Sequence, residues 1–416
     1  MNPKPSLWTK VFTKHRALAF LVGLVCLSMH SVSRSTQLSE KLYWMKLTAN
    51  DRFERQLLAE MGVSMDTIAE DYVITIGHAD LLQKMQKQNK VQAFYEIIPE
   101  RDFPAQDSNY HNYEELSQAL TQANLNNPDI TTLESIGKTV EGRDILRLRI
   151  SGQLQIADQL PAVLFVGGHH AREHLSVEIP LSAIEHLLTE YRNGNEKIVR
   201  LINSRDLHFI PALNADGLEY DVATGTYKAW RKNRRVNANG SYGVDLNRNY
   251  GYGWGTGGSS KSPNDDTFMG TSAFSEPETQ AIRDYVKAHT NISTLLSFHT
   301  FSQLILYPWG GKSEGVANQQ DRAVFEKMAK QMATWNGYQP MQASQLYIAS
   351  GDTCDWAYGE LKIFCFTFEL DPKQSWGVGG FYPGDEMIPQ VFNKNINPIL
   401  YLIENAGNPY AVLSQQ

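Results

Sequence analysis

The stretch Gly167-Gly168-His169-His170-Ala171-Arg172-Glu173-His174 follows directly after the apolar run 162–166, Ala-Val-Leu-Phe-Val. A short apolar run bounded by glycine is typical of a strand covered on both faces, so we expect a buried strand that breaks into a loop at Gly167. An imidazole and a carboxylate three residues apart, at His170 and Glu173, can converge on one Zn²⁺ ion if the turn bends them inward.

A third metal ligand is available far downstream, where the run Leu295-Leu296-Ser297-Phe298 ends in His299. A catalytic zinc ion needs three protein ligands and one open position for water. Each pattern alone is weak, because His-x-x-Glu also occurs in polar turns and a single histidine after a strand is usually a core residue. Since both follow apolar strands of one domain, we interpret His170, Glu173 and His299 as ligands of one zinc ion per chain, in a hydrolase.

The apolar periodicity beyond residue 110 predicts strands that alternate with helices. Strands are expected at 145–150, 162–166, 207–210, 295–298 and 363–368, and helices at 113–123, 177–191, 276–289, 322–335 and 391–404. This alternation predicts an α/β fold in which a mixed, mostly parallel central sheet is flanked by helices on both faces. Such sheets bind ligands at the carboxyl ends of their strands, where the candidate zinc ligands fall.

The N-terminal part of the chain reads as two further pieces. Residues 10–16 carry Lys10, Lys14 and Arg16 ahead of the apolar run 17–27, which is typical of a secretory signal. The run is shorter than the roughly 20 apolar residues that span a bilayer, although an uncleaved anchor stays an alternative. Residues 40–98 alternate short strands and helices and predict a small α+β unit, followed by the polar linker 99–108.

The charge balance argues against a nucleic-acid partner. The formal net charge is -7, and the first 36 residues hold five basic groups and no acidic ones, so the remainder stands at -7 - 5 = -12. An acidic body repels phosphates. Beyond the signal only Cys354 and Cys365 remain, and the sequence leaves open whether they pair.

A candidate general base closes another apolar run, Ile363-Phe364-Cys365-Phe366-Thr367-Phe368, at Glu369. Burying a carboxylate there is costly unless it is paired or functional, although it can also mark a solvated strand end. In a zinc hydrolase it would take a proton from the zinc-bound water.

Two basic stretches, 228–235 and 243–250, stand out against the acidic body. Most basic clusters are solvated surface, but the Asn247-Arg248 pair offers an amide beside a guanidinium, which can hold a carboxylate through forked hydrogen bonds. A zinc hydrolase with such a clamp suggests a peptidase that takes its substrate by the C-terminus.

Several motifs together resemble one family. HAREH, NADGLEY, WRKNRR, GVDLNRNYG, LLSFHTFSQLILYPWG, LYIASGDTCDWAYG and FTFEL occur in the order found in zinc metallocarboxypeptidases of the A/B type. The likeness covers about residues 108–405 and is strongest to the secreted bacterial T-type enzymes. Two histidines and one glutamate are the known zinc ligands of carboxypeptidase A, so this ligand set also follows from the resemblance.

The resemblance implies a role for each matching residue. Glu369 would be the base, and Arg231 would stabilise the oxyanion of the tetrahedral intermediate. Asp245 would orient His170. Asn247, Arg248 and Tyr347 would bind the terminal carboxylate of the substrate, and Arg172 would line the approach on the other side of the scissile bond.

The pocket for the terminal side chain would be formed by the segment 350–355. Cys354 stands where B-type relatives have an acid and A-type relatives an aliphatic residue, and it behaves as a small apolar residue. Asp352 resembles the acid of the T-type pocket, although it can also be a turn residue capped by local amides. We therefore expect a preference for hydrophobic and, more weakly, basic C-terminal residues of peptides or proteins.

The resemblance also implies a zymogen. Residues 1–36 would be the signal peptide, 37–107 an activation domain with its linker, 108–407 the catalytic domain and 408–416 a tail. The activation domain would cover the cleft until a protease cuts near Arg101, or would remain as a folding aid. The mature protein is expected to be secreted or periplasmic, without stable membrane association after signal cleavage.

Three alternatives remain. In the inverted zinc motif, His170 and His174 would both bind metal with Glu173 as the base, but that needs a helix where Gly167-Gly168 favours a loop. A cell-wall peptide carboxypeptidase or amidase could share the fold. A non-catalytic peptide-binding module would be expected to lose the base or a ligand. The family itself often has Trp at the position of His174, and the disulfide of the pancreatic enzymes has no counterpart here.

Overall fold

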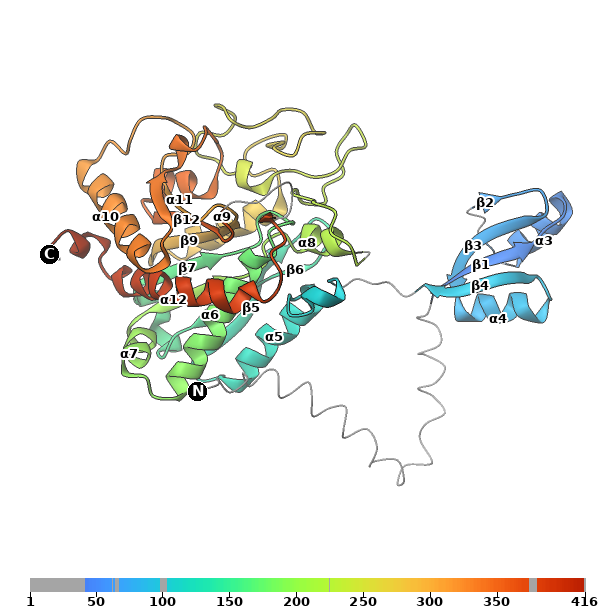
Figure 1. The fold of residues 1–416 in the computed structure, drawn as a ribbon, viewed down its shortest axis with the longest axis horizontal. Helices are drawn as coiled ribbons and strands as arrows, with labels where there is room; N and C mark the ends of the chain where they lie inside the picture. Colours follow the sequence, from blue (N-terminus) through green and yellow to red (C-terminus); the bar gives the residue numbers. More distant parts are fainter. Residues whose placement is uncertain are drawn as a thin grey trace, which may run out of the picture. The chain divides into compact units, whose positions relative to one another are not determined.

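The computed structural model describes residues 42–61, 63, 67–97, 103–223, 225–373 and 380–414. The chain forms two compact units, Met1–Pro99 and Glu100–Gln416 (Figure 1). The predicted signal peptide and the predicted cleavage site at Arg101 lie outside the described residues. The division after Pro99 comes earlier than the predicted boundary between residues 107 and 108. No helix among the described residues has the length and apolarity needed to cross a membrane.

The first unit is a small antiparallel sheet with two helices. Its strand order is β2-β3-β1-β4, and β1 pairs with both β3 and β4. Alternate residues of β1, Met45 and Leu47, face a core that also receives Leu58 and Met85 from the two helices. The elements are β1 Leu42–Thr48, α3 Arg52–Glu60, β2 Thr67–Ile68, β3 Tyr72–His78, α4 Ala79–Lys87 and β4 Val91–Ile97.

The second unit contains an eight-stranded mixed sheet in the order β11-β10-β12-β9-β7-β8-β6-β5. The four central strands β12, β9, β7 and β8 run parallel, so their carboxyl ends meet at one edge. The strands are β5 Thr131–Lys138, β6 Asp144–Ile150, β7 Ala162–Val166, β8 Asp206–Ile210, β9 Ile292–Thr300, β10 Leu304–Tyr307, β11 Gln339–Gln342 and β12 Phe364–Leu370.

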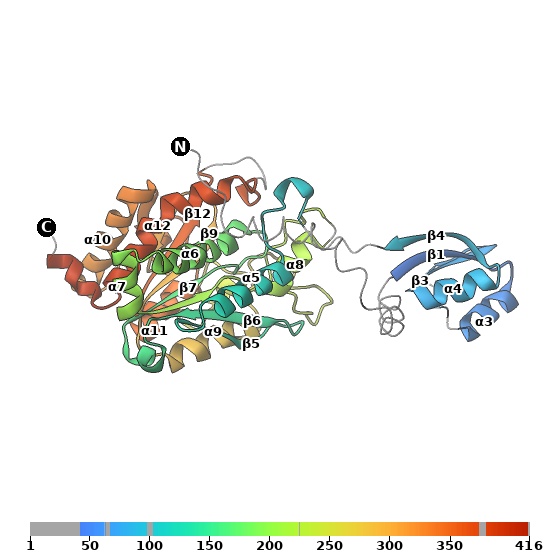
Figure 2. The ribbon, with the colours of Figure 1, turned by 90° about the horizontal axis from the view of Figure 1, so that it is seen from below.

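Helices cover both faces of this sheet (Figures 1 and 2). One apolar cluster joins Phe165 and Phe298 of the sheet to α5, α6, α7, α8, α10 and α12, and another joins Leu164 and Leu295 on the opposite face to α9 and α11. The α/β expectation is thus confirmed. The helices are α5 Tyr113–Asn126, α6 Leu175–Arg192, α7 Glu196–Ser204, α8 Ala215–Val222, α9 Pro277–Ala288, α10 Gln319–Asn336, α11 Thr353–Leu361 and α12 Met387–Asn405.

The elements missing from the sequence prediction are short or lie at the sheet margin. Strand β5 is mostly exposed or half-buried, and β11 has the sequence Gln-Pro-Met-Gln, so neither shows an apolar run. Helices α7, α8 and α11 and strand β10 were also not expected. Short turns of 3₁₀ helix complete the unit at Ala105–Asp107, Leu154–Gln159, Leu246–Arg248, Ala343–Gln345 and Pro409–Ser414.

Candidate active site

The loop between β7 and α6 turns sharply at Gly167. A β-carbon at this position would lie 2.2 Å from the carbonyl oxygen of Ser176 and 2.6 Å from that of Pro211, so only glycine fits the turn. The strand ends at Val166 and helix α6 starts at Leu175, and the intervening residues are not helical. The predicted loop is confirmed, and it carries both His170 and Glu173.

His170, Glu173 and His299 converge, although His299 comes from the end of β9. Their ligand atoms all lie within 4.8 Å of one another. His299 Nδ1 is 3.1 Å from His170 Nδ1 and 2.9 Å from Glu173 Oε2, and His170 Nδ1 is 2.8 Å from Glu173 Oε1. All three side chains are buried. Two imidazole nitrogens directed at each other beside a carboxylate form a donor set for a cation.

The surroundings of His170 fit metal binding. Its second ring nitrogen, Nε2, lies 3.1 Å from Asp245 Oδ1. A carboxylate at this nitrogen holds the proton there and leaves the lone pair of Nδ1 for the metal. Burial alone would raise the pKa of Asp245, but the charges of Arg231 and His170 hold that pKa well below its usual range. Asp245 therefore stays a carboxylate, which is the form that a residue orienting His170 needs.

Glu369 lies beside the three candidate ligands. In the parallel pairing of β12 with β9, Glu369 is the register partner of His299. Burial and the negative charge of Glu173 raise the pKa of Glu369 to about 8. A divalent cation between the ligands would oppose that shift, since it favours the charged carboxylate.

Arg231 also lies beside the candidate ligands. Its side chain, 11% exposed, donates from Nε to Asp245 Oδ2 at 2.9 Å, and Nη1 is 3.9 Å from Glu173 Oε1. The backbone of its loop is tied to the loop that carries His170 and Glu173, because the amide of Ala171 donates to the carbonyl of Arg231 at 3.0 Å. A fixed guanidinium next to the ligands can stabilise negative charge that develops there.

Asn247, Arg248 and Tyr347, the predicted carboxylate clamp, are close to one another. Arg248 is buried, and its Nη2 lies 3.4 Å from the hydroxyl of Tyr347, which is 56% exposed. Its Nε finds no partner among the described residues. Asn247 Nδ2 lies 3.5 Å from Nε2 of His299. Arg248 thus has one hydrogen-bond donor that no described residue uses.

Thr353 is a residue of this site that the sequence analysis missed. Its hydroxyl and its backbone amide both donate to Asn247 Oδ1, at 2.9 and 3.0 Å. This pairing fixes the amide of Asn247 with its NH₂ group toward His299. The only signal in the sequence was the position of Thr353 after a capping aspartate, which does not indicate a partner so distant in the chain.

Asp352 caps helix α11. Its Oδ1 accepts from the backbone amides of Cys354 and Asp355, both at 2.9 Å, so the alternative that local amides satisfy this carboxylate is correct for one oxygen. The other oxygen, Oδ2, is buried without a partner among the described residues. Burial raises the pKa of Asp352.

Cys354 is half of a disulfide with Cys365 of β12, which answers the question that the sequence left open. The sulfur of Cys354 is therefore bonded across to the sheet, and the prediction that Cys354 acts as a small apolar residue of the substrate pocket stays a prediction. Both cysteines are buried.

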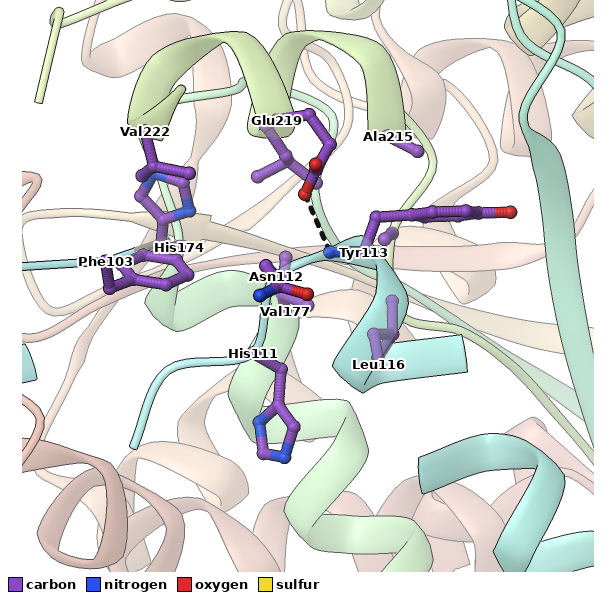
Figure 3. Close-up of a pocket in the computed structure, with 12 residues that line it drawn as sticks. Phe103, His111, Asn112, Tyr113, Leu116, His174, Val177, Ala215, Glu219 and Val222 are labelled. Carbon is purple, nitrogen blue, oxygen red and sulfur yellow. Dashed lines mark hydrogen bonds between the residues drawn. The ribbon is translucent and has the colours of Figure 1, made fainter. Parts of the chain in front are cut away.

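Arg172 and His174 flank Glu173 but point to other partners. Arg172 packs 4.2 Å from the ring centre of Phe381 and reaches Asp266 at 3.2 Å. His174 Nε2 lies 2.9 Å from Asp221 Oδ2, and its ring lines a small pocket (Figure 3) that contains none of the three candidate ligands. The inverted zinc motif needs His174 beside His170, and the group of possible ligands contains His299 in its place.

The chain matches known proteins over most of its length. A family model described as zinc carboxypeptidase covers residues 116–398. The chain belongs to this family. Zinc carboxypeptidases are peptide hydrolases, and the group His170, Glu173 and His299 could hold the family's metal.

Among related zinc carboxypeptidases, the enzyme of Saccharothrix mutabilis subsp. capreolus is 36% identical over 320 residues, which cover 75% of this chain and 73% of that protein. Bovine carboxypeptidase B is 33% identical over 276 residues, 64% of each chain. The crystal structure of carboxypeptidase A from Helicoverpa armigera superposes with a TM-score of 0.64 at 25% identity and covers 91% of this chain and 99% of that one.

Proposed function

We propose that this zinc carboxypeptidase removes C-terminal residues from peptides and proteins, with Glu369 as the general base. The observation that carries the proposal is that His170, Glu173 and His299 lie close together, next to Glu369. Glu369 is the register partner of His299 in the pairing of β12 with β9. Zinc, when bound, lowers the pKa of a coordinated water and polarises a carbonyl oxygen. Glu369 accepts the proton of the attacking water and later delivers it to the leaving amine.

The other residues hold the substrate. Arg248, Asn247 and Tyr347 bind its terminal carboxylate, and the unpartnered Nε of Arg248 supports this role. Arg231 stabilises the oxyanion that develops on the scissile carbonyl. Arg172 contacts the peptide on the other side of the scissile bond.

The terminal side chain of the substrate lies beside Asp352 and the Cys354–Cys365 disulfide. A disulfide is apolar and favours hydrophobic side chains, while the unpartnered Oδ2 of Asp352 accepts from lysine or arginine. The carboxylate repels glutamate. A comparison of kcat/KM on peptides ending in Leu, Phe, Arg and Glu tests this preference, and a preference for Glu would contradict it.

The enzyme is exported to the periplasm or the medium and made as a zymogen. The basic residues and apolar run in residues 10–27 support export. The boundary between the two compact units after Pro99 is close to Arg101, which supports removal of the first unit by an activating protease. Intact chain is expected to be nearly inactive and to gain activity after limited trypsin cleavage. Full activity of the uncut chain would contradict the zymogen.

The central test combines metal content with substrate chemistry. The protein, before and after limited trypsin cleavage, is analysed for zinc and assayed on an N-blocked dipeptide and on the same dipeptide with an amidated C-terminus. One zinc per chain and hydrolysis of the free acid alone are expected. Equal hydrolysis of the amide would refute the carboxylate clamp and favour an amidase.

A further inference from the structure

The segment 103–113, here called the N-terminal strap, is firmly held although the proposed reaction uses none of its residues. Phe103 and Tyr110 are 6% and 2% exposed, and their rings stack with centres 5.2 Å apart. Buried aromatic rings contribute strongly to packing, so this segment is part of the core of the second unit and not a loose connection.

Phe103 packs against the residue that follows a metal ligand. Its ring meets the ring of His174 edge to face, with centres 4.8 Å apart, and Figure 3 shows the two side by side. Phe103 lines a small pocket together with His174 and with Val177, Leu218 and Val222 from α6 and α8, and the position of its ring among these residues is here called the socket. Because His174 directly follows Glu173 in the chain, a shift of His174 in the socket is expected to shift Glu173 as well.

Asp221 connects the socket to the loop of Arg231. It accepts from the backbone amide of Trp230 at 2.7 Å and from the hydroxyl of Tyr382 at 2.9 Å, and it holds His174 at 2.9 Å. Asp221 is completely buried. One carboxylate thus fixes the neighbours of both Glu173 and Arg231.

The strap also contacts Tyr227 and residues 382–385, which adjoin Asp221. Tyr227 donates to Asp107 Oδ2 at 2.7 Å and stacks on Tyr382 with ring centres 3.9 Å apart. Further along, Asn109 donates to Asp385 Oδ2 at 2.9 Å from its backbone amide, and the hydroxyl of Tyr110 donates to the carbonyl of Pro383 at 2.8 Å. The strap therefore ties residues 382–385 to the loop of Arg231.

The inner end of the strap is anchored on helices. The backbone amide of His111 donates to Glu178 Oε1 of α6, and that of Tyr113 to Glu219 Oε1 of α8, both at 2.7 Å. The second bond is drawn in Figure 3. The strap thus spans the two helices that form the socket.

We propose that the N-terminal strap is a positioning element of the active site. Phe103, in the socket, keeps Glu173 in position through His174, and Asp221 links His174 to the loop of Arg231. The proposal rests on the roles proposed above for Glu173 and Arg231. It also sets a limit on proteolytic maturation, because a cut that removes Phe103 and Asp107 empties the socket and frees Tyr227.

The first test uses full-length variants taken through the same trypsin treatment as the wild type. Phe103→Ala is expected to lower kcat about tenfold while KM stays within about twofold, since the strap touches the catalytic loops and not the carboxylate clamp. Zinc content stays at one per chain, but a chelator removes the metal several times faster, as expected when a residue that supports a ligand is lost. Phe103→Leu, which still fills the socket, recovers most of kcat.

Leu120→Ala is the matched control, because Leu120 is a fully buried core residue of α5 outside the socket. It is expected to lower the melting temperature to a similar extent without changing kcat or zinc release. If kcat and the rate of zinc release are unchanged in Phe103→Ala, the positioning role of the strap is contradicted. If the wild type hydrolyses no peptide, the proposed function is contradicted.

A second measurement does not depend on variants that fold. The full-length chain is digested with proteases of different specificity, and the first residue of each product is determined beside its activity. Every fully active product is expected to begin at or before Phe103. A fully active product that begins after Phe103 would overturn the proposal.

Discussion

Glu369 and His299 are register partners at the carboxyl ends of the adjacent parallel strands β12 and β9. Adjacent parallel strands lie about 4.8 Å apart, so this pairing brings a carboxylate to a candidate metal ligand without any contribution from a loop. A site built on strands is more rigid than one built on loops, which suits a base that must meet a water at hydrogen-bond distance.

Replacement of Glu369 by Gln tests the base. The amide keeps the shape of the side chain but cannot accept the proton, so kcat is expected to fall by about 10²- to 10⁴-fold. Zinc content should not change, since Glu369 is not one of the three ligands. The measurement is hydrolysis of a blocked dipeptide with metal analysis of the same sample, and a kcat within about twofold of the wild type would exclude this role.

A pair of variants tests whether His299 or His174 is a zinc ligand. His299→Ala removes one of three ligands and is expected to abolish zinc binding and activity. His174→Ala removes a partner of Asp221 and should still bind one zinc per chain at saturating zinc. Metal analysis after gel filtration decides, and loss of zinc from the second variant alone would restore the inverted motif.

The clamp is tested at Arg248. Arg248→Ala removes a charged hydrogen-bond donor for the terminal carboxylate, and kcat/KM is expected to fall about 10- to 100-fold, mainly through KM. Arg192→Ala serves as the control, because Arg192 is a partly exposed arginine that pairs with Asp129. Should both variants show the same KM as the wild type, Arg248 does not bind the substrate carboxylate.

The sequence predicted the central features of the fold because they depend on local apolar runs. The run 162–166 is buried on both faces of the sheet, so its boundaries and the loop at Gly167 follow from composition. The site residues came from the family resemblance and from polar residues at strand ends. Strand β11 was missed because an edge strand needs no apolar run.

Other features depend on pairs of residues that only the folded chain brings together. Thr353 orients Asn247 across more than a hundred residues, and no local pattern marks that contact. Cys354 meets Cys365 because α11 packs on β12, an arrangement set by the sheet order. The family often has Trp at the position of His174, and the sequence does not indicate what this histidine contacts. The structure shows that it packs against Phe103 and pairs with Asp221.

The disulfide is tested by replacing both cysteines with alanine. Its two ends are 11 residues apart in the sequence, so the cross-link is expected to contribute about 2–3 kcal/mol to the free energy of unfolding. Because the backbone amide of Cys354 donates to the capping residue Asp352, the variant should also change the ranking of kcat/KM among C-terminal residues. Urea unfolding under zinc saturation gives the first quantity, and an unchanged midpoint would show that the cross-link does not stabilise the fold.

The last prediction concerns stability against pH at His111. The charge of Glu178 raises the pKa of His111 to about 9, and Glu115 and Glu185 add to the effect. The ring nitrogen Nδ1 lies 2.8 Å from Glu178 Oε2. Since the folded-state pKa lies above the unfolded value of about 6.5, the stabilisation is complete below pH 6.5 and is lost as the pH rises through about 9.

Comparison with His111→Gln isolates this contribution, because glutamine does not titrate. Burial also raises the pKa of Glu278 to about 7, but that group is present in both proteins and cancels in the difference. The free energy of unfolding of the wild type minus that of the variant is expected to be constant up to about pH 6.5 and to decrease towards pH 9. A difference that stays flat from pH 6 to 10 would mean that His111 is not held in its charged form by Glu178.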